Sequence, residues 1–145
     1  MTILAAVNGE RDVDRVVEVA ADLADAYDDE LVAVHVLSNE EFADRQDSTP
    51  NYYLEDAEEN ARNLVRRVAR NTLDDAGGVT PRGVVGSVSE SIVETARELE
   101  PRYLVIGGRK RSAVGKALFG STTQDILFDA EVPVVTVMRR EGDEA

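Results

Sequence analysis

Residues 2–37, TILAAVNGERDVDRVVEVAADLADAYDDELVAVHVL, decide the fold of this chain. Thr2–Val7 is an apolar run too short for a helix and ends at the turn signal Asn8-Gly9, so it predicts a buried strand. From Asp12 onward, apolar residues recur at the three-and-four spacing of a helix with one buried face: Val13, Val16, Val17, Ala20, Leu23, Ala24 and Tyr27. Glu30–Leu37 predicts a second strand, and its continuous apolar run is typical of a parallel sheet covered by helices on both faces.

The rest of the chain continues this alternation of strands and helices. Residues 38–51 are polar and lack periodicity, so we expect a long, flexible surface loop there. The later patterns predict a helix from about Tyr53 to Asp75, a strand over Val79–Val85, a helix with a capping box at Ser87–Glu90 that ends before Pro101, a strand over Tyr103–Ile106, a short helix with a capping box at Ser121–Gln124 and a body over Ile126–Ala130, and a strand over Val134–Met138. We expect one domain over 1–139, followed by a disordered acidic tail over 140–145.

These elements predict a single three-layer α/β/α domain, in which helices cover both faces of a five-stranded, mostly parallel open sheet. Ligands of such sheets bind outside the carboxyl ends of the strands, at the point where the strand order reverses. The loops after the first, second and fourth strands are therefore the candidate positions for a site.

Composition narrows the classes of function. The chain of 145 residues has no cysteine and one histidine, which argues against disulfides, thiolate metal sites and zinc chemistry. Its formal charge of −13 argues against a nucleic-acid partner, because phosphate backbones are bound by clustered lysine and arginine. Lys110 and Lys116 are its only lysines, and an acidic, lysine-poor composition is typical of salt-adapted proteins. The start of the chain does not resemble a leader and no apolar run has membrane-spanning length, so we expect a soluble, cytoplasmic protein without a membrane partner.

The loop after the fourth strand carries the clearest signal of a site. Gly107-Gly108 allows close approach of the backbone and positive φ, and Arg109-Lys110-Arg111 supplies three consecutive basic residues. Ser121 opens a helix whose first amides are unpaired and carry partial positive charge. Each feature alone also has an ordinary structural explanation, as a turn, a solvated surface or a helix cap. Their combination in so acidic a chain predicts a site for a phosphate.

Other polar residues give weaker signals. His35 lies in the most apolar strand without an evident nucleophile to serve, so we expect a structural role for it. The carboxylate pairs Asp22/Asp25 and Glu58/Glu59 fall on predicted polar helix faces. Asp12 and Asp14 stand near the start of the first helix, from which they could approach a nucleotide-bound magnesium ion.

Several landmarks of the chain, taken in order, are similar to those of the universal stress protein family over essentially its whole length. They are the opening strand Ile3–Val7, the end of the second strand at Val34–Val36, the Gly86-Ser87 pair, and Val132–Val135 before and within the last strand. Nucleotide-binding members of the family carry a glycine, two residues, a second glycine, nine residues, then glycine and serine or threonine. This chain has Gly107, Lys110 in place of the second glycine, then Gly120 and Ser121.

The resemblance implies a sheet order of 3-2-1-4-5 and a bound nucleotide, which we expect to be ATP, with or without Mg²⁺. The predicted nucleotide-contacting residues are those that the resemblance implies, together with the adjacent basic side chains. They are Val7, Asn8, Val36, Ile106, Gly107, Arg109, Lys110, Gly120, Ser121 and Thr122. Lys110 would obstruct phosphate if glycine is needed at its position, and would strengthen binding if it is not. Asn8 stands where family members commonly place an aspartate, and it keeps an acceptor while adding a donor.

Three classes of function follow from these observations. The first is a regulatory protein that binds a nucleotide and is non-catalytic, or at most hydrolyses ATP slowly. The second is a nucleotide-free, dimeric interaction module of the same family. The third is a nucleotide-dependent enzyme, against which Asn8-Gly9-Glu10-Arg11 argues, because adenylating ligases and ATP pyrophosphatases resemble one another in a Ser-Gly-Gly-x-Asp-Ser loop there.

The last strand predicts a partner. Val134–Val137 is apolar, ends the sheet, and follows Pro133, whose missing amide is tolerated at the start of an edge strand. An exposed apolar edge invites pairing, and a two-fold copy of the same strand would cover it. We therefore expect a homodimer through this strand, as the resemblance also implies.

Overall fold

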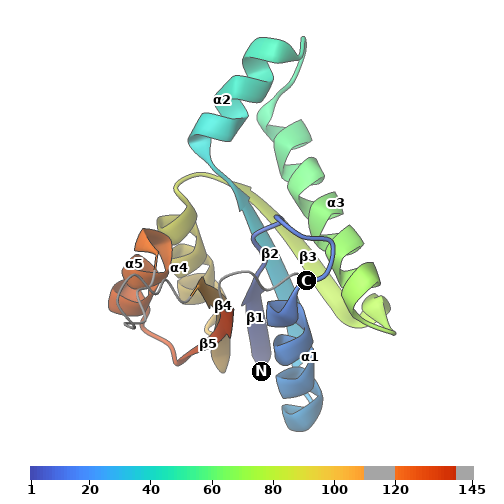
Figure 1. The fold of residues 1–145 in the computed structure, drawn as a ribbon, viewed down its shortest axis with the longest axis vertical. Coiled ribbons are helices and arrows are strands. Elements are labelled where there is room, and N and C mark those ends of the chain that lie inside the picture. The colour runs from blue at the N-terminus through green and yellow to red at the C-terminus, as the bar shows by residue number, and fades with distance from the viewer. Residues whose placement is uncertain (110–119, 140–145) are drawn as a thin grey trace.

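The computed structural model describes residues 1–109 and 120–139, which form a five-stranded parallel sheet between two layers of helices (Figure 1). The strands lie in the order β3-β2-β1-β4-β5 and every neighbouring pair is parallel, which confirms the predicted fold class. In chain order the elements are β1 (Thr2–Ala6), α1 (Arg15–Tyr27), β2 (Glu30–Leu37), α2 (Asn39–Ser48), α3 (Leu54–Thr72), the short 3₁₀ helix η1 (Ala76–Gly78), β3 (Val79–Val85), α4 (Val88–Leu99), β4 (Tyr103–Arg109), α5 (Ser121–Asp129) and β5 (Val134–Arg139). None of the described helices is long and apolar enough to cross a bilayer.

The core consists of two clusters of buried side chains, one on each face of the β-sheet. Ile3 packs with residues of α1 and α3, such as Val17 and Val65, whereas its neighbour Leu4 packs with Ile92 of α4 and Ile126 of α5. Successive residues of a strand point to opposite faces, so one short apolar strand supplies both core clusters. This explains why the strands are almost continuously apolar.

The chain reverses its direction of travel across the sheet after β3. It moves from β1 through β2 to β3, and then returns to place β4 on the other side of β1. The carboxyl ends of β1 and β4 therefore separate, which is the position at which open sheets of this kind form a crevice.

The segment expected to be a loop over 38–51 is instead largely helical. Ser38 accepts a hydrogen bond from the Glu41 amide at 3.2 Å, glutamates occupy the first turn of α2, and Arg45 lies in the last turn. This local capping and charge order favour a helix even though α2 buries no residue. The prediction of a loop was wrong because a helix that is polar on every side has no apolar periodicity. In Figure 1, α2 and the start of α3 extend away from the sheet.

Helix ends also differ from the predictions. α3 ends at Thr72, before Asp75, and β4 extends to Arg109. Within the described residues, Ser87 occupies the N-cap position of α4 without a side-chain cap bond, so that capping box is not formed. Gly120, not Ser121, is the N-cap of α5, which leaves Ser121 as the first helical residue and removes the second predicted capping box.

One glycine sets the distance between α3 and β3. A Cβ atom added to Gly83 would lie 2.2 Å from the backbone oxygen of Glu58 and 2.8 Å from the amide nitrogen of Arg62. Backbone atoms cannot move aside as the end of a side chain can, so α3 can pack this closely only over a residue without a side chain.

Four side chains close the amino edge of the sheet and form what we term the amino-edge cluster: Tyr27, Asp29, Arg102 and Tyr103. The Arg102 guanidinium donates to both Asp29 carboxylate oxygens, at 2.8 and 3.4 Å, and lies 4.2 Å from the centre of the Tyr27 ring. Only 2% of the Asp29 side chain is exposed. The hydrogen bonds from Arg102 hold the pKa of Asp29 below its ordinary value.

Candidate functional site

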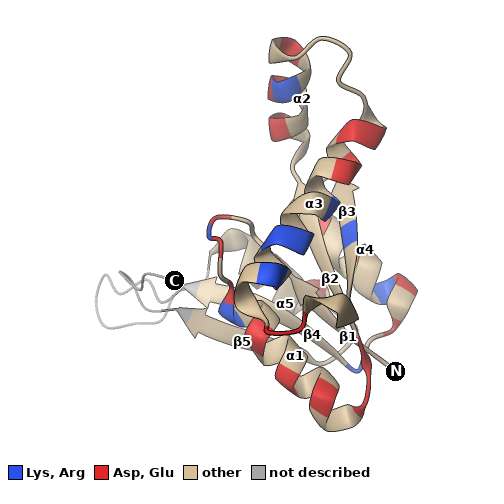
Figure 2. Cartoon of the chain, turned by 90° about the vertical axis from the view of Figure 1, so that its right-hand side faces the viewer, with Lys and Arg blue, Asp and Glu red and all other residues tan. Residues whose placement is uncertain are grey.

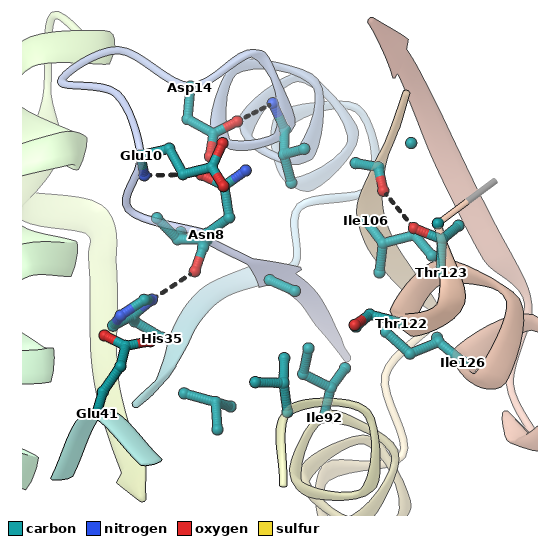
Figure 3. A pocket seen from close by; sticks show the side chains of 18 residues that line it. Asn8, Glu10, Asp14, His35, Glu41, Ile92, Ile106, Thr122, Thr123 and Ile126 are labelled. Carbon is teal, nitrogen blue, oxygen red and sulfur yellow. Dashed lines mark hydrogen bonds between the residues drawn. The ribbon is translucent and has the colours of Figure 1, made fainter. Parts of the chain in front are cut away.

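A cavity of ≈ 330 Å³ opens at the carboxyl edge of the sheet, between the ends of β1 and β4 (Figure 3). We term it the carboxyl-edge cavity. Its volume is within the range of small-molecule sites. The end of β1 with the loop after it, the end of β2 and Glu41 of α2 supply one side, and β4 with the first turn of α5 supplies the other. The cavity thus lies where the strand order predicted a site.

Much of the apolar wall of the cavity comes from one face of the sheet and the two helices that cover it. Val36 and Ile106 are buried strand residues, and Ile92 and Ile126 are buried on α4 and α5. All four belong to the same core cluster, so the packing of the domain fixes their positions. This wall suits a flat apolar group.

The loop after β1 folds on itself. Asn8 Oδ1 accepts a hydrogen bond from the Glu10 amide at 3.0 Å, and Gly9 between them has φ +78°. This is an Asx-type turn, in which the side chain replaces a backbone acceptor. Asn8 therefore lines the cavity as predicted, and its oxygen also shapes the loop.

Asp14 connects this loop to α1. Its side chain is buried and accepts from the Val16 amide at 2.9 Å, while its own amide donates to the Thr72 hydroxyl at 3.0 Å. Asp14 is thus the N-cap of α1, whose first turn it holds against the cavity. Asp12, the other residue expected near magnesium, pairs with Arg67 at 3.8 Å and is not among the cavity residues, so the structure does not bring the two aspartates together there.

His35 fixes the end of β1. Its Nδ1 lies 2.8 Å from the Val7 carbonyl oxygen, and since a carbonyl only accepts, Nδ1 carries the proton. The bond agrees with the predicted structural role. His35 also lines the cavity, next to Glu41 of α2 in Figure 3, which the sequence did not indicate.

The β4 side is joined to α5 by one hydrogen bond. The Thr123 hydroxyl donates to the Gly107 carbonyl at 3.1 Å, so the start of α5 is held over the end of β4. Gly120, Thr122 and Thr123 line the cavity, and the first amides of α5 have no partner within the helix. Ser121, which the sequence predicted as a ligand, is exposed and is not among the cavity residues.

The sequence allowed positive φ at Gly107 and Gly108, but neither glycine adopts it. Among the described glycines only Gly9 has a positive φ. A Cβ added at Gly107 would meet Val16 Cγ2 at 3.4 Å, which is ordinary contact, and one at Gly120 would meet nothing within 4 Å. Gly107 and Gly120 both lie in extended backbone that other residues can adopt. What they give the cavity is therefore the space that a side chain would otherwise fill.

The charge of the described lining is negative. Glu10, Asp14 and Glu41 line the cavity, and its described part includes no lysine or arginine. The side chain of Arg109 and the whole of Lys110 lie outside the described residues, so the predicted basic triplet has no placement here. Within 1–109 and 120–139 no group of three histidine, aspartate or glutamate side chains has the arrangement of a metal site.

The structure therefore brings together most of the predicted residues. The described residues that were predicted and that line the cavity are Val7, Asn8, Val36, Ile106, Gly107, Gly120 and Thr122. Cavity residues that were not predicted as ligands include Glu10, His35, Glu41, Ile92, Thr123 and Ile126. The spacing of Ile92 and Ile126 on their helices indicated only that they are buried, and nothing in the sequence connects Thr123 to Gly107.

Comparison with known proteins gives a consistent result. A model of the universal stress protein family matches residues 1–138. A universal stress protein of Mycolicibacterium smegmatis is 28% identical over 140 residues, covering 93% of this chain and 47% of the relative. The chain thus spans about half the length of that curated relative.

Solved structures of similar fold cover nearly the whole chain. A universal stress protein from Archaeoglobus fulgidus has a TM-score of 0.61 at 27% identity, with 94% of this chain and 97% of that one covered. A universal stress protein in complex with cAMP has a TM-score of 0.62 at 22% identity, covering 95% and 96%. An Arabidopsis thaliana family member with AMP bound has a TM-score of 0.59 at 18% identity, covering 96% and 92%.

Proposed function

The chain belongs to the universal stress protein family, and from this premise we propose that it binds an adenine nucleotide, ATP foremost, in the carboxyl-edge cavity. The observation that carries the proposal is the composition of the cavity, which joins an apolar wall to the first turn of a helix across ≈ 330 Å³. An adenine ring and a phosphate need these two environments, respectively. Two structural neighbours hold cAMP and AMP, which supports the class of ligand.

The proposed pose follows from the two walls. The base lies against Val36 and Ile106, with the ribose toward Asn8. The phosphates extend to Gly107 and the start of α5, where the amides of Gly120 to Thr122 receive them. Ser121 then contributes its backbone amide, since its side chain is not a cavity residue.

The acidic lining imposes a condition on a triphosphate. Glu10, Asp14 and Glu41 would repel phosphate charge, so the proposal requires a counter-charge from Arg109 and Lys110 or from Mg²⁺. Of these carboxylates, Asp14 already accepts from the Val16 amide. With no cluster of three suitable ligands in the described part of the chain, Mg²⁺ would enter with the nucleotide and be held mainly by its phosphates.

We propose a regulatory role in which the bound state, not turnover, is the output. His35, the one histidine of the chain, already donates Nδ1–H to the Val7 carbonyl, and in Figure 3 it lies across the cavity from Thr122 and Thr123, where we place the phosphates, so it is not positioned to activate a water beside them. Any hydrolysis of ATP is therefore expected to be slow.

The test is to purify the protein without added nucleotide, denature it, and identify what is released by chromatography and mass spectrometry. ATP or AMP near one per chain would support the proposal. If the protein emerges empty, calorimetry with ATP, AMP and cAMP, each with and without Mg²⁺, gives the affinity and the preferred phosphate. An empty protein that binds none of them would refute it.

The rival function is a nucleotide-free interaction module of the same family. It is favoured by Lys110 at the position of the expected glycine and by the acidic lining of the cavity. A Lys110→Gly variant separates the two. If Lys110 blocks the site, the variant gains nucleotide binding; if Lys110 contacts phosphate, the variant loses affinity.

We also propose a homodimer through β5. The strand is at one edge of the sheet, and Val134, Val135 and Thr136 are partly exposed on it. A second copy of the strand would complete its backbone hydrogen bonds and cover these side chains. Light scattering in high salt should give the mass of a dimer, and a monomer mass would remove this part of the proposal.

Adaptation to high salt remains a proposal from charge. Figure 2 shows acidic residues spread over α1, α2 and the start of α3, with basic residues gathered further along α3. Added salt shortens the range of repulsion from about 10 Å at 0.1 M to about 3 Å at 1 M. The thermal midpoint should therefore rise with KCl, and a midpoint that is unchanged or falls would contradict this proposal.

A further inference from the structure

The edge of the sheet opposite β5 is a second, separate surface. β3 is the edge strand there, and none of its residues is fully buried, whereas β2 beside it is almost wholly buried. A groove of ≈ 720 Å³ follows β3 over Pro81–Val84, between α3 and α4. We term it the β3 groove.

The backbone of β3 presents a defined row of groups to this groove. Gly86 donates its amide to the Leu37 carbonyl at 3.0 Å, and Leu37 pairs with Val85. In a parallel ladder alternate residues turn both backbone groups to the same neighbour, so Val85 faces away from β2, as do Gly83 and Pro81. Pro81, which has no amide hydrogen, is tolerated because it lies on this outer side.

The outward row therefore offers the carbonyls of Pro81 and Gly83 and the amides of Gly83 and Val85. Among the described residues, no strand lies beyond β3. The backbone–backbone hydrogen bonds of this part of the chain use none of these four groups. An extended segment placed here would add to the sheet through main-chain hydrogen bonds.

The walls of the β3 groove differ in chemistry. Arg82 pairs with Glu98 of α4 at 3.0 Å, so side chains on this face of β3 point toward α4. Glu90, Glu94 and Glu98 line the α4 wall at four-residue spacing, on one face of the helix. Gly83, the next residue of the strand, faces α3, whose backbone it nearly touches.

Charge in the groove favours a basic occupant. Its lining includes four glutamates and two arginines, and both arginines are already paired, Arg82 with Glu98 and Arg62 with Glu59. Glu94 pairs with Arg97 from outside the groove, at 3.0 Å and with both side chains exposed, so the remaining acidic charge is centred on Glu58 and Glu90. The hydrogen bonds from Arg82 hold the pKa of Glu98 below its ordinary value, so this carboxylate stays charged. Because an added strand alternates its side chains, only every second residue would face the α4 wall.

We propose that the β3 groove binds an extended, basic segment of a partner protein as an additional strand, with lysine or arginine at alternate positions facing α4. This function does not depend on nucleotide binding, since the groove shares no residue with the carboxyl-edge cavity.

The probe is a short synthetic peptide that alternates lysine and threonine, labelled for fluorescence anisotropy and added to the full chain at low salt. Its control is a peptide of the same composition with all lysines in one block, which has the same charge without the alternation. The alternating peptide should bind saturably and more tightly. On binding, the amides of Gly83 and Val85 should exchange more slowly with solvent, and the amide of Thr136, which faces outward on the opposite edge, should not change.

A pair of variants separates the groove from the general acidity of the surface. Glu90→Gln with Glu94→Gln should weaken binding of the alternating peptide by about three- to tenfold, the value expected for two exposed ion pairs. Glu18→Gln with Asp22→Asn on exposed positions of α1 removes the same charge and should leave the affinity unchanged.

The proposal is overturned if the alternating peptide does not bind, if both peptides bind alike, if the two double variants behave alike, or if the protected amides belong to another strand. Pairing of β3 with a second copy of β3 would also overturn it, and would appear as a peptide-independent increase in mass that protects the same amides.

Discussion

The two ends of the sheet are built by the same central strands, and they use polar groups in opposite ways. At the amino edge, Arg102 pairs with Asp29 and lies over the Tyr27 ring, whose hydroxyl is 3.5 Å from that of Tyr103. At the carboxyl edge, the chain leaves the sheet after β1 at Asn8 while β4 continues past Gly107, and a cavity lies between them. The difference shows that polar contacts close one end of these strands while the other end borders a cavity. Substitutions at the two ends should therefore affect stability and binding separately.

The largest effect is expected from Arg102→Met, which removes the partner of the almost fully buried Asp29 carboxylate. Of the described basic groups that pair with Asp29, the Met1 nitrogen, 3.4 Å away, would remain. Because the folded pKa of Asp29 is lowered, its contribution to stability is present above the unfolded pKa and is lost as pH falls through the folded pKa. The variant should melt at a lower temperature at neutral pH and unfold in acid at a higher pH, as followed by circular dichroism.

The control for Arg102 is Arg97→Met, which breaks exposed ion pairs with Glu94 and Glu131 and should change the melting temperature little. Nucleotide affinity of the folded Arg102 variant should equal that of the parent chain. A loss of affinity would mean that the two ends of the sheet are energetically coupled, and would contradict the separation of stability from binding that we expect.

The next effect is expected from Thr122→Phe, which fills the carboxyl-edge cavity from the exposed first turn of α5. Crowding of a well-packed site costs roughly 1–3 kcal/mol, or about 10- to 100-fold in nucleotide affinity. The matched control is Gln124→Phe, which adds the same ring to an exposed position of the same helix outside the cavity. Equal affinities for the two variants by calorimetry would place the nucleotide elsewhere.

A smaller effect is expected from His35→Phe, which removes the donor to the Val7 carbonyl. Loss of one such hydrogen bond lowers the free energy of unfolding by about 1–2 kcal/mol, measured by urea denaturation. His35→Gln keeps an N–H donor and should recover part of the loss. If both variants are as stable as the parent, the bond to Val7 does not hold the end of β1.

The smallest effect is expected from Glu41→Gln, which removes one negative charge from the α2 side of the cavity. Affinity for ATP should rise about two- to threefold at low salt, in keeping with an exposed charge, and the gain should disappear at high salt. Glu40→Gln, on the same helix but outside the cavity lining, is the control. A gain that persists in molar salt would point to a direct contact in place of a field effect.

The fold was predictable because its signals are local and repeated. Apolar runs such as Glu30–Leu37 and Val79–Val85 have the strand bounds that the sequence indicated. α2 was missed because its stability comes from a cap and charges, which leave no apolar period. Asp14 did offer a usable signal, since an aspartate just before an apolar helical run is a common N-cap.

The site was predictable only in part. Strand order and family pattern led to Asn8, Val36, Gly107 and Gly120, because their positions follow from where strands end. The bond between Thr123 and Gly107 joins residues 16 apart across a crossover, and no local pattern encodes it. Glu41 lies in α2, within the segment that was expected to be a loop, so an error in secondary structure concealed a residue of the site.

The close contact at Gly83 has an evolutionary consequence. A side chain there would meet the backbone of α3 at 2.2 Å, whereas Arg82 and Val84 on either side point to the opposite face. As relatives of this chain diverge, residues 82 and 84 can drift within their chemical classes. Residue 83 has only one amino acid open to it unless α3 itself is displaced, and a lineage that lost this glycine would have to reshape the β3 groove in the same step.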